Sequence, residues 1–228
     1  MIEDDKNDSW VTNEVQEKFG WFKEDNTAYR TRYLTYLKDK GRTEGEVNST
    51  ANSSLKIIKK FGNPKEESFF RKGLVVGNVQ SGKTENFNGV LNSAIDMGYR
   101  LIIVLSGIME DLRVQTQRRL HEDVVGFYEN GKRLGVATVK TFGDEEDHPE
   151  VKQINVPTSV ESDFDVNMRD AGFNLNQQTN VLVCKKNTAV LANLLIFLDK
   201  NVAEDGSGKL DIPLLIIDDE ADNASLNN

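Results

Sequence analysis

The fold class is indicated by one stretch of the chain, Gly73-Leu74-Val75-Val76-Gly77-Asn78-Val79-Gln80-Ser81-Gly82-Lys83-Thr84. Its first four residues are typical of a buried strand, and its last eight match the phosphate-loop pattern G-x-x-x-x-G-K-[ST]. Glycines at both ends of the loop let the backbone wrap an anion and direct its N–H groups inward. A strand, a glycine-rich loop and a helix in this order predict a site for the phosphates of a nucleotide.

Two side chains of this loop have separate expected roles. Lys83 is expected to reach the β- and γ-phosphates of ATP, and the hydroxyl of Thr84 is expected to hold Mg²⁺. The preceding residues of the loop, Gly77 to Gly82, are expected to contact the phosphates through the backbone. Gln80 could also sense the nucleotide, although a role as loop filler fits equally.

Short apolar runs alternate with helical patterns after the loop, which is typical of a mostly parallel sheet with crossover helices. The spacing of the apolar residues predicts strands at 73–76, 100–105, 136–139, 181–184 and 214–217, and helices at 87–95, 111–120 and 188–198. Gly98 is the expected C-terminal cap of the first of these helices. We therefore expect an α/β fold.

The pattern before residue 66 is helical instead. One apolar stripe is formed by Tyr29, Tyr33, Tyr36 and Leu37, with Gly41 as the expected stop. A second stripe is formed by Leu55, Ile58 and Phe61, and it ends at Gly62 and Pro64. Residues 1–65 are therefore expected to form a helical N-terminal region, and residues 66–228 to form the α/β domain.

An acidic run, Asp218-Asp219-Glu220-Ala221-Asp222, follows the last predicted strand. A buried strand that ends in acids brings a carboxylate to the same sheet edge as the phosphate loop. Asp219 is expected to hold Mg²⁺ with Thr84, and Glu220 is expected to polarise the attacking water. Asp218 is the competing choice for the metal, because it too could lie at the strand end. The expected catalytic residues are thus Lys83, Asp219 and Glu220.

These motifs resemble those of known proteins. The run from Asp219 to Asp222 resembles motif II of superfamily two helicases, and Leu101–Gly107 with Leu112–Gln115 occupies the place of their motif Ia. More narrowly, residues 73–84, 98–107, 112–118 and 217–222 resemble the Z-one domain family of endonucleases. Those are large bacterial proteins with a helicase-like ATPase, often associated with restriction-modification or phage-defence loci. The resemblance covers about residues 55–228.

The resemblance implies a RecA-like P-loop NTPase domain, with a mostly parallel sheet flanked by helices. It implies that the chain binds and hydrolyses ATP with Mg²⁺, as part of a helicase- or translocase-like protein that acts on DNA with nuclease or other defence subunits. Such proteins have a second RecA-like domain, which supplies an arginine worth about 10³ to 10⁵ in rate. We expect the chain to hold only the first domain and to hydrolyse ATP slowly by itself.

Motif Ia of such helicases touches the nucleic-acid backbone, and the matching helix carries a polar, basic set of side chains, Arg113, Gln115, Gln117 and Arg118. They could contact phosphates, although a solvated helix surface fits equally. Lys185, Lys186 and Asn187 could do the same, and an exposed turn is the favoured interpretation. Two other functions stay open: a regulatory module controlled by ATP without translocation, and, less favoured, a P-loop kinase, which would need an arginine-rich lid.

The net charge of −9, from 28 basic and 37 acidic residues, taken alone argues against a nucleic-acid partner. Residues 141–170 carry −7 of it and have few apolar anchors, so we expect a solvated acidic insertion or a loop there. The average charge therefore does not decide the partner.

Other chemistries find little support. Cys184 has no cysteine to pair with and is expected to be a buried strand residue, and His121 and His148 lack the spacing of zinc ligands. Glu150-Val151-Lys152 with Asp144 and Asp147 matches a nuclease pattern, but no apolar strand carries it, so no nuclease centre is expected here. No apolar run approaches the roughly 18 residues of a membrane helix, and no targeting segment is evident, so we expect a cytoplasmic protein without a membrane partner.

Overall fold

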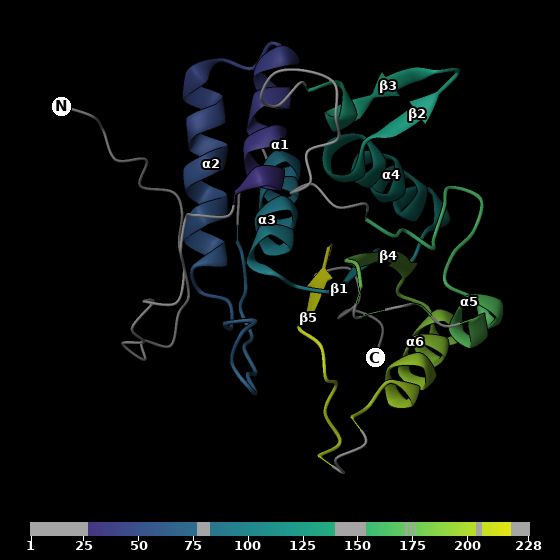
Figure 1. Cartoon of the computed structure of the whole chain (residues 1–228). Helices are drawn as coiled ribbons and strands as arrows, with labels where there is room; N and C mark the ends of the chain where they lie inside the picture. Colours follow the sequence, from purple (N-terminus) through teal and green to yellow (C-terminus); the bar gives the residue numbers. More distant parts are fainter. Residues whose placement is uncertain are drawn as a thin grey trace. The chain divides into compact units, whose positions relative to one another are not determined.

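The computed structural model describes residues 27–76, 83–139, 154–171, 173, 175, 177–203 and 207–219. The chain divides into two compact units, Met1–Met97 and Gly98–Asn228. Each unit packs its own set of helices and strands (Figure 1). The functional division predicted after residue 65 stays a prediction.

The first unit packs three helices side by side, α1 (Ala28–Asp39), α2 (Glu44–Ile58) and α3 (Lys83–Met97) (Figure 1). The aromatic stripe predicted for the first helix is confirmed, since Tyr29, Tyr33, Tyr36 and Leu37 are all buried. Gly41 follows this helix with φ of +88°, a left-handed conformation that glycine adopts without strain. The predicted stop is therefore confirmed.

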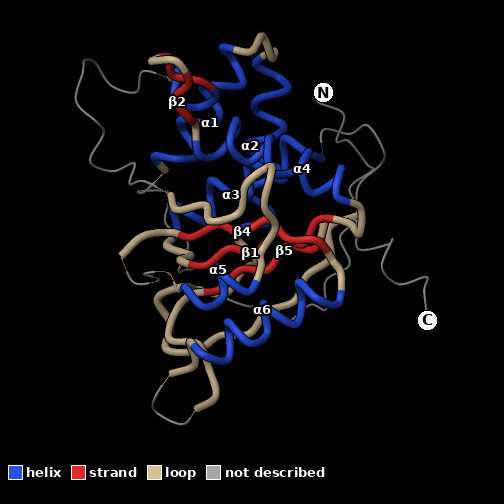
Figure 2. The backbone as a smooth tube through the Cα atoms, turned by 90° about the vertical axis from the view of Figure 1, so that its right-hand side faces the viewer, coloured by secondary structure: helices blue, strands red, loops and turns tan. Residues whose placement is uncertain are grey.

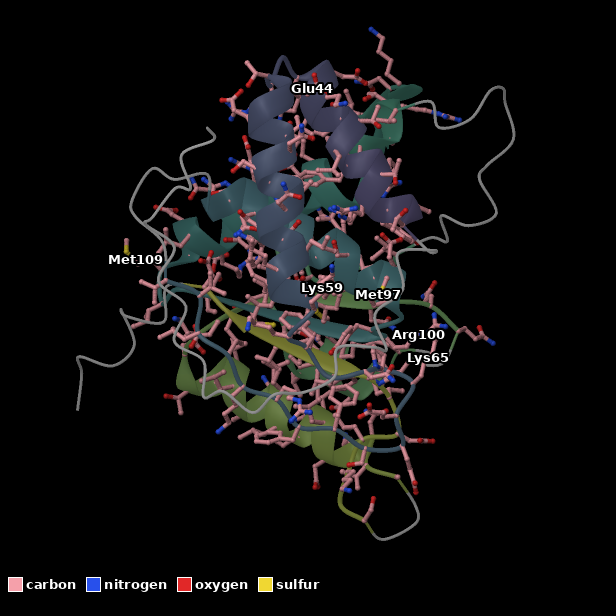
Figure 3. All side chains as sticks on the ribbon, turned by 90° about the vertical axis from the view of Figure 1, so that its left-hand side faces the viewer. Glu44, Lys59, Lys65, Met97, Arg100 and Met109 are labelled. Atoms are coloured by element: carbon pink, nitrogen blue, oxygen red, sulfur yellow. The ribbon has the colours of Figure 1, made fainter. Side chains whose placement is uncertain are left out.

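The second helix is longer at its start than the apolar spacing predicts. Thr43 caps it: the Thr43 hydroxyl accepts from the Glu46 backbone N at 3.3 Å, and the Glu46 carboxylate accepts from the Thr43 backbone N at 2.8 Å. This capping box begins α2 at Glu44, and the helix ends at Ile58, before Phe61; Glu44 and Lys59 mark its two ends in Figure 3.

A buried carboxylate joins the third helix to the first. Asp96, one residue before the end of α3, accepts hydrogen bonds from the backbone N–H groups of Tyr29 and Arg30, each at 2.9 Å. These donors lie in the first turn of α1, where backbone N–H groups lack helical partners. Desolvation by burial nevertheless raises the pKa of Asp96 to about 7, against the opposing effect of those hydrogen bonds and of Arg30 and Arg32. Gly98 closes α3 with φ of +100°, as predicted.

The second unit contains a three-stranded parallel sheet, coloured red in Figure 2, in the order β4 (Asn180–Lys185), β1 (Leu101–Ser106), β5 (Leu214–Asp218). The three strands confirm the predictions at 100–105, 181–184 and 214–217. β1 and β4 are buried along almost their whole length, as strands covered on both faces are. The α/β class is therefore confirmed.

Helices cover both faces of this sheet. α4 (Glu110–Leu120) lies on one face, and α5 (Val166–Ala171) and α6 (Thr188–Lys200) lie on the other (Figures 1 and 2). The predicted helices at 111–120 and 188–198 are confirmed. The core between the sheet and α6 consists of Leu101, Ile103, Phe164, Leu175, Leu182, Cys184, Val190, Leu194 and Phe197.

The segment after α4 differs from the prediction. The strand expected at 136–139 is wrong, because Gly135–Thr138 forms a 3₁₀ turn, η2, which packs on a π-helical turn, η1 (His121–Val125). Between these turns lies an antiparallel hairpin, β2 (Phe127–Glu129) and β3 (Lys132–Leu134). Asn130 and Gly131 form its tip with φ of +50° and +75°, as two-residue hairpin turns require.

The acidic stretch is less solvated than predicted. Residues 140–153 lie outside the described part, but Phe164 is 1% exposed in the core, and Asn155 forms a parallel bridge with Asn180 beside β4. The Thr158 hydroxyl also accepts from the Val183 backbone N at 3.0 Å. Residues 156–165 form neither helix nor strand, which agrees with the loop interpretation, and a few anchors fix this loop against the sheet. Among the described helices, none has the length and apolar character needed to cross a membrane.

Candidate functional site

The carboxyl ends of the three parallel strands meet at one edge of the second unit. Ser106 of β1 pairs with Lys185 of β4, and Leu105 pairs with Asp218 of β5. The residues that follow these strands are therefore brought together although they lie far apart in the sequence. Ligands of open α/β sheets bind at this edge.

Lys186 follows β4 and links its end to the end of β5. Its ammonium donates to Asp218 Oδ1 at 2.7 Å and to the Asp219 carbonyl at 2.9 Å, and its side chain is only 5% exposed. The favoured interpretation of Lys186 as part of an exposed turn is therefore wrong. The same holds for Lys185, which is partly buried and pairs with Glu110 at 2.6 Å. Asn187 instead caps α6, its side chain accepting from Val190 N at 2.9 Å.

The two candidate metal ligands differ in their surroundings. The carboxylate of Asp218, 44% exposed, is engaged by Lys186. Asp219 follows the strand, and its backbone N donates to the Leu105 carbonyl at 2.9 Å. Carboxylate oxygens are donors that Mg²⁺ prefers, and Asp218 and Asp219 place two carboxylate residues at the end of β5, so the residue types fit Mg²⁺. Glu220 and Asp222 lie outside the described residues.

The phosphate loop is described only at its end. Gly77, Asn78, Val79, Gln80, Ser81 and Gly82 lie outside the described residues, and so does the side chain of Lys83. α3 begins at Lys83, so Lys83 and Thr84 belong to its first turn, and the helix predicted after the loop is confirmed.

The strand predicted before the loop is wrong. Residues 73–76 are irregular, and Leu74, Val75 and Val76 are 59%, 53% and 50% exposed. A strand needs a neighbour to take up its backbone hydrogen bonds, and within the described residues no strand pairs with this run. Apolar composition alone therefore did not make a strand here.

The helix that matches motif Ia is anchored by a buried arginine. Arg113 is completely buried and donates to Glu110 Oε1, at 2.6 and 2.9 Å, and to the carbonyls of Ser159, at 2.6 Å, and Val160, at 2.9 Å. The hydrogen bonds from Arg113 lower the pKa of Glu110 to about 2, and Lys185 acts in the same direction. Arg113 therefore fixes the start of α4 against the segment before Phe164.

The predicted basic face is only half exposed. Arg113 and Gln117 are fully buried, because the helical period turns both toward the inside of the unit, so the prediction that they contact nucleic acid is wrong. The Gln117 amide has no hydrogen-bond partner among the described residues. Gln115 and Arg118 are exposed, and their contact with nucleic acid stays a prediction. Met109, before α4, is 63% exposed and projects from the ribbon in Figure 3.

The remaining candidates add no second centre. Glu150-Val151-Lys152, Asp144, Asp147 and His148 lie outside the described residues, and among the rest no group of three metal-ligating side chains occurs. Burial lowers the pKa of His121. Cys184 is fully buried in β4, as predicted.

Sequence reasoning missed the roles of Lys186, Glu110 and Arg113. Lys186 and Asp218 lie 32 residues apart, and Arg113 and Val160 lie 47 apart, so no local pattern joins them. Only the order of strands in the sheet brings these charges together. Comparison with family models, with curated proteins and with solved structures found no match to this chain.

Proposed function

We propose that this chain binds and hydrolyses ATP with Mg²⁺, as the RecA-like domain of a helicase- or translocase-like protein that acts on DNA. The observation that carries the proposal is the start of α3 at Lys83. The last two residues of G-x-x-x-x-G-K-[ST] thus begin a helix, and the first turn of a helix offers free N–H groups and a positive dipole end to phosphates.

The acidic run supports the proposal independently. It begins at the carboxyl end of β5, a strand of a parallel sheet, which is where such sheets present their functional side chains. This position of Asp218 and Asp219 supports a role at the functional edge. The exposed side chains of Gln115 and Arg118 on α4 support contact with a nucleic-acid backbone, and the resemblance to the Z-one domain family supports a role beside a nuclease or defence system.

Each residue has one role in this mechanism. The backbone of Gly77–Gly82 binds the phosphates, and Lys83 neutralises the β- and γ-phosphates. Thr84 and Asp219 would hold Mg²⁺, which neutralises charge on the phosphates when bound. Glu220 orients the attacking water and accepts its proton.

The loop is tested by Lys83→Ala, with Lys65→Ala as the matched control. Lys65 is an exposed lysine of the same unit, labelled in Figure 3. We expect Lys83→Ala to weaken binding of ATP–Mg²⁺ at least about thirtyfold, which corresponds to about 2 kcal/mol, and Lys65→Ala to leave it within about twofold. The measurement is isothermal titration calorimetry, and equal affinities of the wild type and Lys83→Ala would refute the site.

The DNA partner is tested separately. Arg118→Ala is compared with Lys132→Ala, an exposed lysine on the hairpin, by DNA-binding titrations at several salt concentrations. Loss of one phosphate contact is expected to reduce the slope of log K against log salt by about one for Arg118→Ala only. If both variants keep the salt dependence of the wild type, Arg118 on α4 does not contact the DNA backbone.

An ATP-controlled regulatory module without translocation is the second candidate. The burial of Arg113 and Gln117 favours it, because half of the predicted phosphate-contacting face is withdrawn from the surface. An ATPase activity of this protein that DNA does not stimulate would favour this candidate.

A further inference from the structure

One residue joins the carboxyl ends of all three strands of the sheet. The backbone N of Lys186, which follows β4, donates to the carbonyl of Gly107, which follows β1, at 3.1 Å. Its ammonium reaches the end of β5.

These contacts hold the backbone at the point where the chain leaves β5. The Asp219 N–H is bound by the Leu105 carbonyl at 2.9 Å, and the Asp219 carbonyl is bound by the Lys186 ammonium at 2.9 Å. Both polar groups of the Asp219 backbone are therefore held by neighbouring strands. A residue fixed on both sides directs its side chain with less conformational freedom, which is what precise metal coordination requires.

The ammonium also distinguishes between the two consecutive aspartates. Asp218 shares a strand face with Leu214, because side chains alternate along a strand, and Leu214 packs against the core beneath α6. On this face its carboxylate is engaged by Lys186. A metal ion that took Asp218 would first have to displace a nearly buried ammonium, whereas coordination by Asp219 leaves this ion pair intact.

We infer that Lys186 is a positioning residue of the acidic motif. Its ammonium keeps the Asp218 carboxylate in an ion pair and fixes the backbone of Asp219. Asp219 is then the residue that coordinates the Mg²⁺ of the bound nucleotide. This inference rests on the proposed function and names a residue that neither motif contains.

The experiment compares Lys186→Met and Lys186→Arg with Lys185→Met as the matched control, since Lys185 is the adjacent lysine and pairs with Glu110 instead. Electron paramagnetic resonance measures Mn²⁺ binding in the presence of ATP. A calorimetric titration with ATP in buffer that contains EDTA measures ATP binding without metal. We expect Lys186→Met to weaken Mn²⁺ binding about tenfold and to leave metal-free ATP binding within about twofold. Lys186→Arg should recover most of the loss, and Lys185→Met should behave as the wild type.

A double-mutant cycle separates positioning from general damage. Asp219→Asn should weaken Mn²⁺ binding strongly, and adding Lys186→Met to it should cause little further loss, because both changes act on one ligand. Asp218→Asn should cost less than Asp219→Asn. If circular dichroism shows that Lys186→Met does not fold, the Mn²⁺ affinities of Lys186→Arg and Asp218→Asn are compared with that of Asp219→Asn instead.

The outcomes distinguish this inference from the proposed function. If Lys186→Met is folded and binds Mn²⁺ as the wild type does, or if Asp218→Asn costs more than Asp219→Asn, the inference is overturned while ATP binding stands. If the wild type itself binds no ATP, the proposed function falls and the inference falls with it.

Discussion

Arg113 illustrates how a charged side chain can serve the interior of a protein. Its guanidinium is completely buried, and Glu110 and two backbone carbonyls take up its donors. Arginine suits this position because its planar fork donates in several fixed directions and stays charged. A lysine at the same place has a single charged centre and would leave carbonyls without a donor.

We therefore expect Arg113→Met to lower the free energy of unfolding by about 3 kcal/mol, because the partly buried carbonyls of Ser159 and Val160 would lose their donors. Urea denaturation followed by circular dichroism measures this loss. Arg118→Met on the exposed side of the same helix is the control and should stay within about 0.5 kcal/mol of the wild type. Equal losses in the two variants would contradict the anchoring role of Arg113.

Cys184 offers a second test at this scale. Burial raises the pKa of its thiol far above the ordinary value, and the side chain is fully enclosed. Since the thiolate is the reactive form, we expect Cys184 to react with Ellman's reagent only as fast as the fold opens. Stopped-flow absorbance in buffer and in guanidinium measures the two rates, and fast labelling of the native protein would show that β4 is accessible.

At the scale of elements, Asp96 couples the stability of the helical unit to pH. Its pKa is about 7 in the folded protein and ordinarily 3.8. Between these values the unfolded chain releases the proton while the folded protein keeps it, so stability is complete below about 3.8, falls as pH rises, and levels off above about 7.

Urea denaturation from pH 4 to pH 8 measures the unfolding free energies of the wild type and of Asp96→Asn. The difference in unfolding free energy should shift in favour of the variant as pH rises through this window, because asparagine does not ionise. Asp39→Asn, at the exposed end of α1, is the control and should show a constant difference. A constant difference for Asp96→Asn as well would mean that its hydrogen bonds to α1 offset the cost of desolvation.

The elements also show which parts of the fold can be predicted from sequence. β1, β4 and β5 follow from apolar runs that no polar residue interrupts, and α1 follows from its aromatic stripe. The apolar run 73–76 looks the same in sequence, yet it lacks a neighbouring strand among the described residues. The spacing of apolar residues shows which face of a segment could be buried. Whether the segment becomes a strand depends on hydrogen bonding to a neighbouring strand.

Two features that the prediction missed, the start of α2 and the hairpin, have signals in the sequence. Thr43-Glu44-Gly45-Glu46 is a capping-box pattern that marks the start of α2, and Asn130-Gly131 is a strong hairpin signal. The ion pair of Lys186 with Asp218 had no such signal, because it depends on which strands are neighbours. The acidic motif could therefore be found from sequence, but its positioning residue could not.

At the scale of the whole molecule, net charge governs how copies of the chain meet. The chain carries −9 at pH 7, and its calculated isoelectric point is about 4.9. Self-repulsion keeps such a protein dispersed at neutral pH and vanishes where the charge is zero. We expect light scattering from pH 4 to pH 9 to show a solubility minimum near pH 5. A minimum above pH 6 would contradict this expectation.

The hairpin β2–β3 has a practical consequence for labelling this protein. At its base, a side chain on Gly126 would collide with the backbone of Ala137, and one on Gly135 would collide with the carbonyl of Glu122. At its tip, the space around Gly131 is open to at least 4 Å. A short peptide tag or a fluorophore attached after Asn130 would therefore extend into solvent, while the base of the hairpin keeps its close packing against η2.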